Sequence, residues 1–251
     1  MKLRRFFLIL GTVLLLGVMV SAGDYSDVAD THWASEQIAY LSDEITGYPD
    51  GTFQPDKTVT RAEFVSLLAR IAFPEELKNE TGSTWWEPAF RVCEANNLLS
   101  GTYGYGEPMP RGEIARILGF LCRDWGGVNV RADAAEQFVI NWNEQRMESP
   151  AWKTLFSDTQ GMDEDRYRVC ANQGLMMGYP DGTFKPENGV TRAEAAVILA
   201  RLKAQLALRK DGYDYVCTVG SNWLLTKTKG AEASLELMNP LTGDNKLTIN
   251  F

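Results

Sequence analysis

Two arginines in this chain stand where a guanidinium group could bind an anion. Arg61 follows Thr60 and Arg192 follows Thr191, and each arginine is followed by Ala-Glu and then by apolar residues at helical spacing. A threonine with a glutamate three residues later is typical of a capping box, so each arginine is expected in the first turn of a helix. Helix N-termini favour anions, and an arginine adds a bidentate fork. The pattern predicts a carboxylate or phosphate site at each arginine, with pairing to local acids as the alternative.

The acidic residues nearby have structural alternatives to ligand binding. Glu63 and Glu194 occupy the carboxylate position of a capping box, and we expect them to cap helices rather than contact a ligand. Asp50 and Asp181 lie in Pro-Asp-Gly turns, where aspartate commonly forms the turn itself, although both could bind sugar hydroxyls. Aromatic rings could either pack in the core or stack on a sugar. The remaining candidate binding residues are Gly51, Gly182, Tyr48, Tyr179 and Trp33.

These candidates belong to an internal repeat. Residues 47–63 and 178–194 lie 131 positions apart and differ at only four places. A worn third copy lies between them, because residues 91–101 align with 168–178 and are followed by Arg111 without a preceding threonine. The glycine-to-arginine distance is 14 residues in the outer copies and 10 in the middle one. We therefore expect the middle unit to lack the long loop and the pocket at Arg111 to be the doubtful one.

Each unit reads as helix, loop and helix, and the units must pack together. One such unit cannot bury its own apolar face, so three are expected to share a core in a mainly helical domain. Residues 123–154 form an insertion to which the sequence gives no role beyond packing. Residues 211–251 alternate polar and apolar residues between Gly and Asn-Pro signals, which predicts a small run of antiparallel strands.

The repeated segments resemble a known family. Residues 47–53 and 178–184, each followed by Thr-Arg-Ala-Glu, are similar to the S-layer homology (SLH) repeat. The resemblance covers residues 24–73 and 155–203 strongly and residues 84–122 weakly. It implies a pseudo-threefold helical bundle that binds a secondary cell-wall polysaccharide, often pyruvylated, and so holds the protein on the bacterial surface. The aromatic-rich starts that match the repeat are Tyr25-Ser26-Asp27, His32-Trp33-Ala34 and Phe156-Ser157-Asp158.

The first 22 residues are predicted to be a signal peptide. Lys2, Arg4 and Arg5 precede an apolar run of about 15 residues, shorter than the ~20 that cross a bilayer, and small residues follow. An uncleaved anchor is the alternative. Cleavage would change the formal charge from −8 to −11, and no later apolar run is long enough to span a membrane. We expect an exported protein at the cell wall, and its acidity disfavours binding to nucleic acid.

The cysteines and the lack of catalytic motifs bear on whether the chain forms disulfides, binds a metal or catalyses a reaction. For Cys93 and Cys170, buried free thiols are favoured over a disulfide, while Cys122 and Cys217 leave the pairing open. The single histidine, His32, belongs to the His-Trp-Ala start of one unit. No nucleophile elbow, metal-ligand cluster or phosphate loop is present, so neither catalysis nor a cofactor nor a metal is expected.

The sequence favours non-catalytic anchoring at the cell surface. The expected partner is a secondary cell-wall polysaccharide or another peptidoglycan-linked glycan, bound through arginines at helix N-termini. The alternative function is a surface scaffold whose repeats no longer bind glycan, and the worn middle unit supports it.

Overall fold

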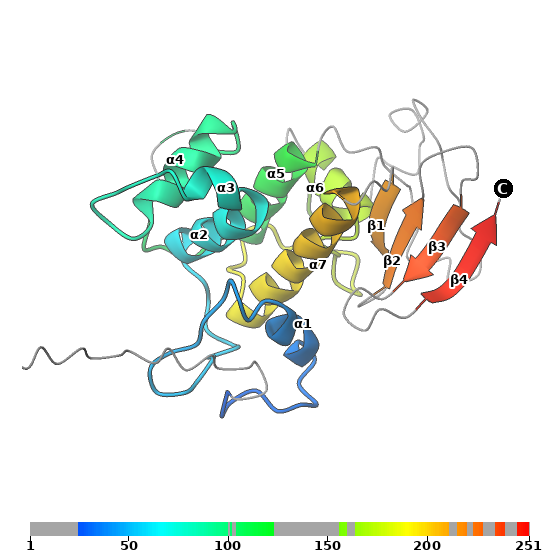
Figure 1. The fold of residues 1–251 in the computed structure, drawn as a ribbon, viewed down its shortest axis with the longest axis horizontal. Helices are drawn as coiled ribbons and strands as arrows, with labels where there is room; N and C mark the ends of the chain where they lie inside the picture. Colours follow the sequence, from blue (N-terminus) through cyan, green and yellow to red (C-terminus); the bar gives the residue numbers. More distant parts are fainter. Residues whose placement is uncertain are drawn as a thin grey trace, which may run out of the picture.

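Seven helices precede four strands in the part of the chain that the computed structural model describes (Figure 1). That part comprises residues 25–99, 101, 104–122, 156–159 and 164–210 and the backbone of the strands. The predicted signal peptide and the insertion lie outside it. The helices are α1 (Ser35–Tyr40), α2 (Arg61–Ala72), α3 (Pro74–Leu77), α4 (Glu87–Ala95), α5 (Arg111–Leu121), α6 (Glu164–Asn172) and α7 (Arg192–Lys210).

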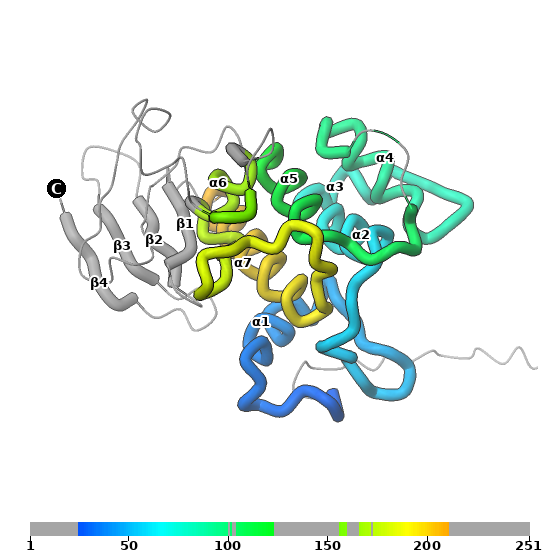
Figure 2. Tube along the Cα trace, turned by 180° about the vertical axis from the view of Figure 1, so that it is seen from behind, coloured from blue at the N-terminus to red at the C-terminus, as the bar shows by residue number. Residues whose placement is uncertain are grey.

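The helices assemble as three pairs around a ring, which confirms the mainly helical fold. The pairs α1–α2, α4–α5 and α6–α7 belong to repeats one, two and three. The first helix of each repeat packs against the second helix of the preceding repeat: α4 on α2, α6 on α5 and α1 on α7. Figures 1 and 2 show α7 running through the middle of the helical part, with α1 at its side. Since α1 closes on α7, the first and last repeats are neighbours.

A closed set of backbone hydrogen bonds marks the pseudo-threefold axis. The Val59 N–H donates to the Val190 carbonyl at 2.9 Å, the Val190 N–H to Met109 at 3.0 Å, and the Met109 N–H to Val59 at 2.9 Å. The three residues are equivalent, because each lies two positions before the first residue of its helix. All three side chains are buried. The threefold arrangement implied by the family resemblance is thus present.

The core is shared by all three repeats because each helix has one apolar face. In α2, Phe64 and Leu68 are fully buried, and Ile114 and Leu118 are their counterparts in α5. The long loops contribute as well, since Phe53 is also fully buried. Full burial of such a side chain stabilises the fold by about 1.5–3 kcal/mol. One connected apolar cluster results, in which no repeat is covered by its own residues alone.

An aspartate at the start of each complete repeat holds its loop in place. The two carboxylate oxygens of Asp27 accept the N–H groups of Phe53 at 2.7 Å and Gln54 at 2.8 Å. Asp158 accepts the two equivalent amides of the third repeat at 2.7 and 2.8 Å. Gln54 has a φ of 55°, a conformation that ordinary residues avoid, and the aspartate holds it there. The sequence analysis assigned no role to these aspartates.

Three cysteines of the described residues are buried and free, which confirms the prediction for Cys93 and Cys170. Cys122 is the third. Burial raises the pKa of Cys93 to about 12 and also raises the pKa of the other two thiols. The Cys170 thiol donates to the Ala115 carbonyl across the α5–α6 contact at 3.2 Å. These thiols therefore behave as small core residues.

The C-terminal segment forms an antiparallel sheet, as predicted. The strands are β1 (Tyr215–Val219), β2 (Trp223–Lys227), β3 (Ser234–Met238) and β4 (Asn245–Asn250), in the order β1-β2-β3-β4. Each strand pairs with the next, and the β3–β4 register shifts between Leu237 and Met238.

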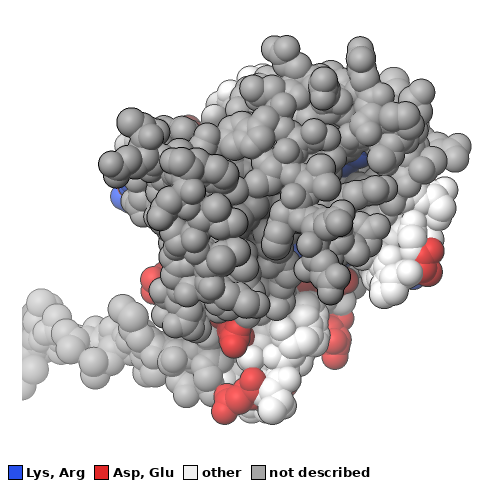
Figure 3. All heavy atoms as spheres, turned by 90° about the vertical axis from the view of Figure 1, so that its right-hand side faces the viewer, with Lys and Arg blue, Asp and Glu red and all other residues white. Residues whose placement is uncertain are grey.

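Acidic side chains outnumber basic ones on one described face of the protein. On the face drawn in Figure 3, acidic side chains reach the surface at several places and few basic ones do. Among the helices of the described residues, none combines the length and apolar character that crossing a membrane requires.

Candidate functional site

Each helix-opening arginine extends its guanidinium group into the loop of the next repeat. Arg192, from repeat three, enters the loop of repeat one, where its Nε donates to Phe53 O at 2.7 Å and its Nη2 to Thr46 O at 3.1 Å. The guanidinium carbon lies 4.9 Å from the ring centre of Tyr48 and 4.6 Å from that of Phe53. Arg192 is 6% exposed. Carbonyls and aromatic faces thus fix the guanidinium group in one orientation.

Arg111 has the same arrangement, and the expectation that its pocket is the doubtful one is wrong. Its Nε donates to Phe184 O and its Nη2 to Met177 O, both at 3.0 Å. Its guanidinium carbon lies 4.9 Å from the ring centre of Tyr179 and 5.1 Å from that of Phe184. The pocket is formed by the complete loop of repeat three, so the short loop of Arg111's own repeat does not affect it.

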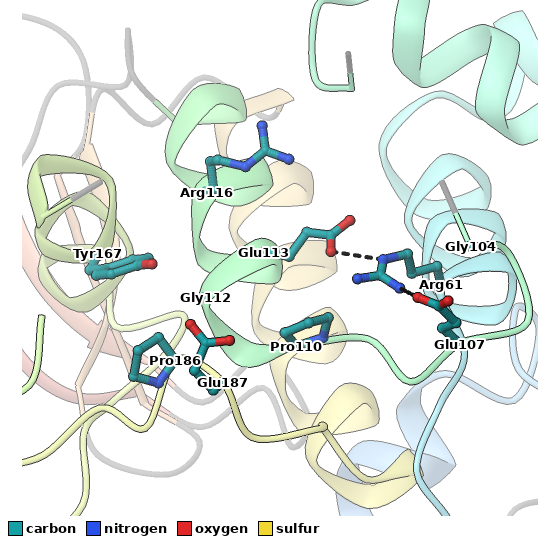
Figure 4. A pocket seen from close by; sticks show the side chains of 10 residues that line it. All are labelled: Arg61, Gly104, Glu107, Pro110, Gly112, Glu113, Arg116, Tyr167, Pro186 and Glu187. Atoms are coloured by element: carbon teal, nitrogen blue, oxygen red, sulfur yellow. Dashed lines mark hydrogen bonds and ion pairs between the residues drawn. The ribbon is translucent and has the colours of Figure 1, made fainter. Parts of the chain in front are cut away.

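The incomplete pocket is instead that of Arg61, which faces the short loop of repeat two. Its Nε bonds to Glu113 and its Nη1 to Glu107, both at 2.8 Å (Figure 4). Partial burial lowers the pKa of Arg61, but the two carboxylates outweigh that effect and raise it. Two acids thus take the place of the carbonyls and rings that hold the other arginines. Pairing with local acids, the alternative left open by the sequence, is what occurs here.

The N–H groups that open the second helices are already used. The Arg61 N–H donates to Glu107 O at 2.9 Å, Arg111 to Asn188 O at 2.9 Å, and Arg192 to Lys57 O at 2.8 Å. The next N–H in each helix also donates to the neighbouring loop. The sequence-based expectation that free helix N–H groups help to bind the anion is therefore wrong. Anion binding at these positions would depend on the guanidinium groups.

The capping predictions are confirmed in repeats one and three. Thr60 and Glu63 form a complete capping box. The Glu194 N–H donates to the Thr191 hydroxyl at 3.2 Å, and the Thr191 N–H donates to Glu194 Oε2 at 2.9 Å. In repeat two, Pro110 provides no side-chain cap.

The turn residues lie at the exposed tips of the long loops. Asp50 Oδ1 accepts the Thr52 N–H at 3.0 Å and the Thr52 hydroxyl at 2.7 Å, and these bonds lower the pKa of Asp50. Asp181 is held in the same way by Thr183. Gly51 and Gly182 have φ values of 81° and 79°, and a Cβ at either would meet no atom within 4 Å. Their requirement for glycine comes from the backbone conformation. The contacts of Asp50 and Asp181 agree with the turn-forming role.

A cavity of about 200 Å³ brings the three repeats together at Arg111. Repeat three contributes Tyr179 and the face of α7 that begins at Glu194, and repeat one contributes Trp33. Trp33 is 60% exposed, so much of its ring faces solvent. Sequence reasoning placed these residues in separate units and did not include six others that line the cavity. These are Leu175, Met176, Met177, Val197, Ile198 and Arg201.

A second cavity, of about 400 Å³, lies at Arg61 (Figure 4). Arg61 and Glu107 lie on one side of it, Glu113 and Arg116 project from α5, and Glu187 lies on the opposite side. Two guanidinium groups thus face three carboxylates. Its volume is twice that of the Arg111 cavity, in agreement with the missing loop.

Comparison with known proteins points to one domain family. The sequence model of the S-layer homology domain matches residues 24–65 and 169–196. Among curated relatives, the Cellulosome-anchoring protein of Acetivibrio thermocellus is 26% identical over 193 residues, which cover 70% of this chain and 38% of that protein. An S-layer protein of Bacillus licheniformis is 27% identical over 199 residues, covering 73% of this chain and 20% of that protein. The Amylopullulanase of Thermoanaerobacterium thermosulfurigenes is 28% identical over 180 residues, which cover 70% of this chain and 9% of that protein.

The chain therefore spans well under half the length of these three relatives. The shared region is found both in surface-layer proteins and in a protein named as an enzyme. Among the described residues, no group of three or more metal-binding side chains could hold an ion.

Proposed function

We propose that this chain carries three S-layer homology repeats, the second degenerate, and anchors at the bacterial cell surface by binding an anionic secondary cell-wall polysaccharide. The match of the family model to residues 24–65 and 169–196 supports the first and third repeats. The binding sites are the guanidinium groups of Arg111 and Arg192. Arg61 has no such role, since its charge is satisfied within the protein.

The observation that carries this proposal is the donor that each held arginine keeps available. Arg192 uses Nε and Nη2 on carbonyls, and its Nη1 has no hydrogen-bond partner among the described residues. In Arg111, Nη1 forms an ion pair with Glu194 at 3.6 Å, a contact longer than a good hydrogen bond, so a ligand carboxylate can compete for this donor. A guanidinium group that is already oriented loses little entropy when it binds a carboxylate, and the resulting bond is charge-assisted. The carboxylate of a pyruvate ketal has suitable chemistry.

The exposed ring of Trp33 is the best placed to stack on a sugar. The rings of Tyr48 and Tyr179 each lie beside an arginine and also beside a lysine, at 4.7 Å for Lys57 and 4.2 Å for Lys185. Those two rings are therefore engaged with cations of the protein. Trp33 lines the Arg111 cavity with much of its surface exposed, and indole rings suit contact with a surface that is partly apolar.

The acidic character of the chain shapes this binding. A formal charge of −8, or −11 without residues 1–22, repels an anionic polymer at long range. Salt screens that repulsion as well as the contacts in the pockets. Wall binding is therefore expected to depend less on salt than binding by a basic wall protein, and a steep loss between low and physiological salt would contradict this.

The proposed role is not catalytic. Proteins named for anchoring and for surface layers share the region, and its occurrence in an enzyme fits an attachment module joined to another activity. The alternative function is a scaffold whose repeats have lost glycan binding. The neutralised Arg61 favours that alternative for one of the three pockets.

Arginine variants separate the two functions. In co-sedimentation with purified sacculi, Arg111→Ala and Arg192→Ala should each weaken binding by about 10- to 100-fold, as expected for loss of a charged hydrogen bond. Arg61→Ala is the matched control and should bind within about twofold of the parent. Parental binding by both Arg111→Ala and Arg192→Ala would favour the scaffold.

A further inference from the structure

The Arg111 cavity contains a second cation to which the proposed anchoring contact assigns no role. Arg201 lies on α7 and lines the same cavity as Arg111. Its Nη1 donates to Leu175 O at 3.3 Å, and its buried Nε has no hydrogen-bond partner among the described residues. Burial lowers the pKa of Arg201. A buried charge without an opposite charge destabilises a fold, so this position calls for another explanation.

A purely structural role explains only part of this arrangement. The equivalent residue of repeat one, Arg70, makes the same type of bond to Glu44 O at 3.0 Å. Arg70, however, is exposed, whereas Arg201 is largely covered and faces a cavity. The carbonyl bond therefore accounts for an arginine at this position. It does not account for a covered guanidinium group beside a second one.

The charges of the two cavities are opposite in sign. Arg111 and Arg201 face one carboxylate, that of Glu194. Glu194 Oε2 already accepts the Thr191 N–H, which leaves Oε1 near Arg111. The Arg61 cavity, by contrast, contains two arginines and three glutamates. On an acidic protein, the Arg111 cavity is thus a local positive site.

The two cations line one groove and bond to different carbonyls of it. Glu194, beside which the Arg111 guanidinium lies, and Arg201 are seven residues apart on the same face of α7. Seven residues of α-helix rise about 10 Å along the backbone, and the two guanidinium groups bond to carbonyls two residues apart, Met177 O for Arg111 and Leu175 O for Arg201. The cavity wall between them is apolar at Val197 and Ile198, and Trp33 also contributes to it. The groove therefore offers two cations and an apolar wall.

We propose that this groove binds a glycan segment with two acidic groups on neighbouring sugars, one held by Arg111 and the other by Arg201. The apolar faces of the sugars lie against Val197, Ile198 and Trp33. This inference rests on the proposed function, since it specifies the ligand of the same site. Its new content is that a second acidic group raises affinity by binding Arg201, a residue outside the Thr-Arg-Ala-Glu segment.

Fragments of the wall polymer test this directly. The polymer is released from sacculi and separated into fragments with one acidic group and fragments with two on neighbouring sugars. Calorimetry on the chain without residues 1–22 should show the second group raising affinity by about 10-fold. Arg201→Gln should remove that gain, and Arg201→Lys should keep part of it. Arg70→Gln, which loses only the carbonyl bond, should bind both fragments like the parent.

Thermal unfolding without ligand supplies the second readout. Because Arg201 is a largely covered cation with no ion pair among the described residues, Arg201→Gln should be at least as stable as the parent. Equal affinity of the parent for both fragments, or a full gain in Arg201→Gln, would overturn the inference while leaving anchoring intact. Loss of stability together with equal weakening toward both fragments would assign Arg201 a structural role and also overturn it. If the parent binds no fragment, the proposed function itself fails.

Discussion

At the scale of single residues, the three equivalent arginines make different contacts because each guanidinium group lies in the loop of another repeat. Arg111 and Arg192 meet complete loops, where carbonyls and rings hold them and leave a donor available. Arg61 meets the short loop and is neutralised by Glu107 and Glu113. The binding capacity of an arginine in this fold therefore depends on its neighbour and not on its own repeat.

Replacing Arg61 should affect stability and leave wall binding nearly intact. Arg61→Ala leaves Glu113, whose side chain is 15% exposed, without its cation. The expected loss is about 1 kcal/mol in the free energy of unfolding. Urea denaturation measures it. Arg61→Lys is the matched control and should lose less, and an unchanged denaturation midpoint in Arg61→Ala would contradict the ion-pair assignment.

Replacing Trp33 should weaken polymer binding and leave stability nearly unchanged, the opposite of replacing Arg61. Because the side chain is 60% exposed, Trp33→Ala should leave the unfolding temperature nearly unchanged. Loss of an aromatic contact of about 0.5–1.5 kcal/mol should weaken polymer binding by about 2- to 10-fold. Trp33→Phe should restore most of the affinity. Binding of Trp33→Ala equal to that of the parent would exclude the stacking role.

At the scale of elements, two contacts determine how loops and helices are positioned. One is the aspartate at the start of each complete repeat, which holds two loop amides. The other is the close approach of α6 to α5 at Gly119, where a Cβ would come within 2.9 Å of the Arg166 Cα. The first contact supports the groove directly, since Asp158 holds Phe184, whose carbonyl accepts the Arg111 Nε–H.

Asp158 should make the stability of the fold depend on pH. Burial acts to raise the pKa of Asp158, but the amide bonds from Phe184 and Lys185 outweigh it and the pKa is lowered. Its stabilising effect is therefore present above the ordinary aspartate pKa of about 3.9 and is lost as pH falls through the lower native value. At pH 7, Asp158→Asn should unfold at a lower temperature than the parent, and this difference should shrink toward pH 3. A difference that stays constant over that range would contradict the assignment.

The α5–α6 contact predicts an unusual response to alanine. In a solvent-facing helix, glycine to alanine is stabilising, but Gly119→Ala places a methyl group against the backbone of α6. The expected cost is about 1–3 kcal/mol in the free energy of unfolding. Arg116→Ala, on the same helix, is the control and should change stability by less than about 0.5 kcal/mol. A stabilised Gly119→Ala would show that the two helices are further apart.

Local signals in the sequence were sufficient for the local features of these elements. Thr60 and Glu63 predicted a capping box, and the Pro-Asp-Gly turns predicted the loop tips, because each depends on residues a few positions apart. The partner of each arginine could not be predicted, since Arg192 and Phe53 lie 139 residues apart and meet only through the order of the ring. The same reason explains why Arg201 and Trp33 were not placed with Arg111. The use of the helix N–H groups by neighbouring loops also depends on that packing.

At the scale of the whole molecule, the fold is one closed ring and not a chain of independent modules. The hydrogen bonds among Val59, Met109 and Val190 need all three repeats, and each first helix packs on another repeat. Both well-formed arginine sites also lie between repeats. Both the stability of the fold and glycan binding should therefore require all three repeats to be packed together in the ring.

Removing one repeat should abolish cooperative folding. A chain ending at Cys122 loses α7, which covers α1, and opens the central set of hydrogen bonds at Val59 and Met109. Circular dichroism during heating should show no cooperative transition for residues 23–122, whereas residues 23–210 should unfold cooperatively. A sharp transition for the shorter chain would mean that the repeats fold independently.

The central claim, that the ring anchors by binding an anionic wall glycan, is tested most directly by co-sedimentation of residues 23–251 with purified sacculi. The sacculi are compared before and after acid extraction of the secondary polymer. The account predicts binding to the intact sacculi and loss of that binding after extraction. Equal binding to extracted sacculi, or no binding to either preparation, would contradict it.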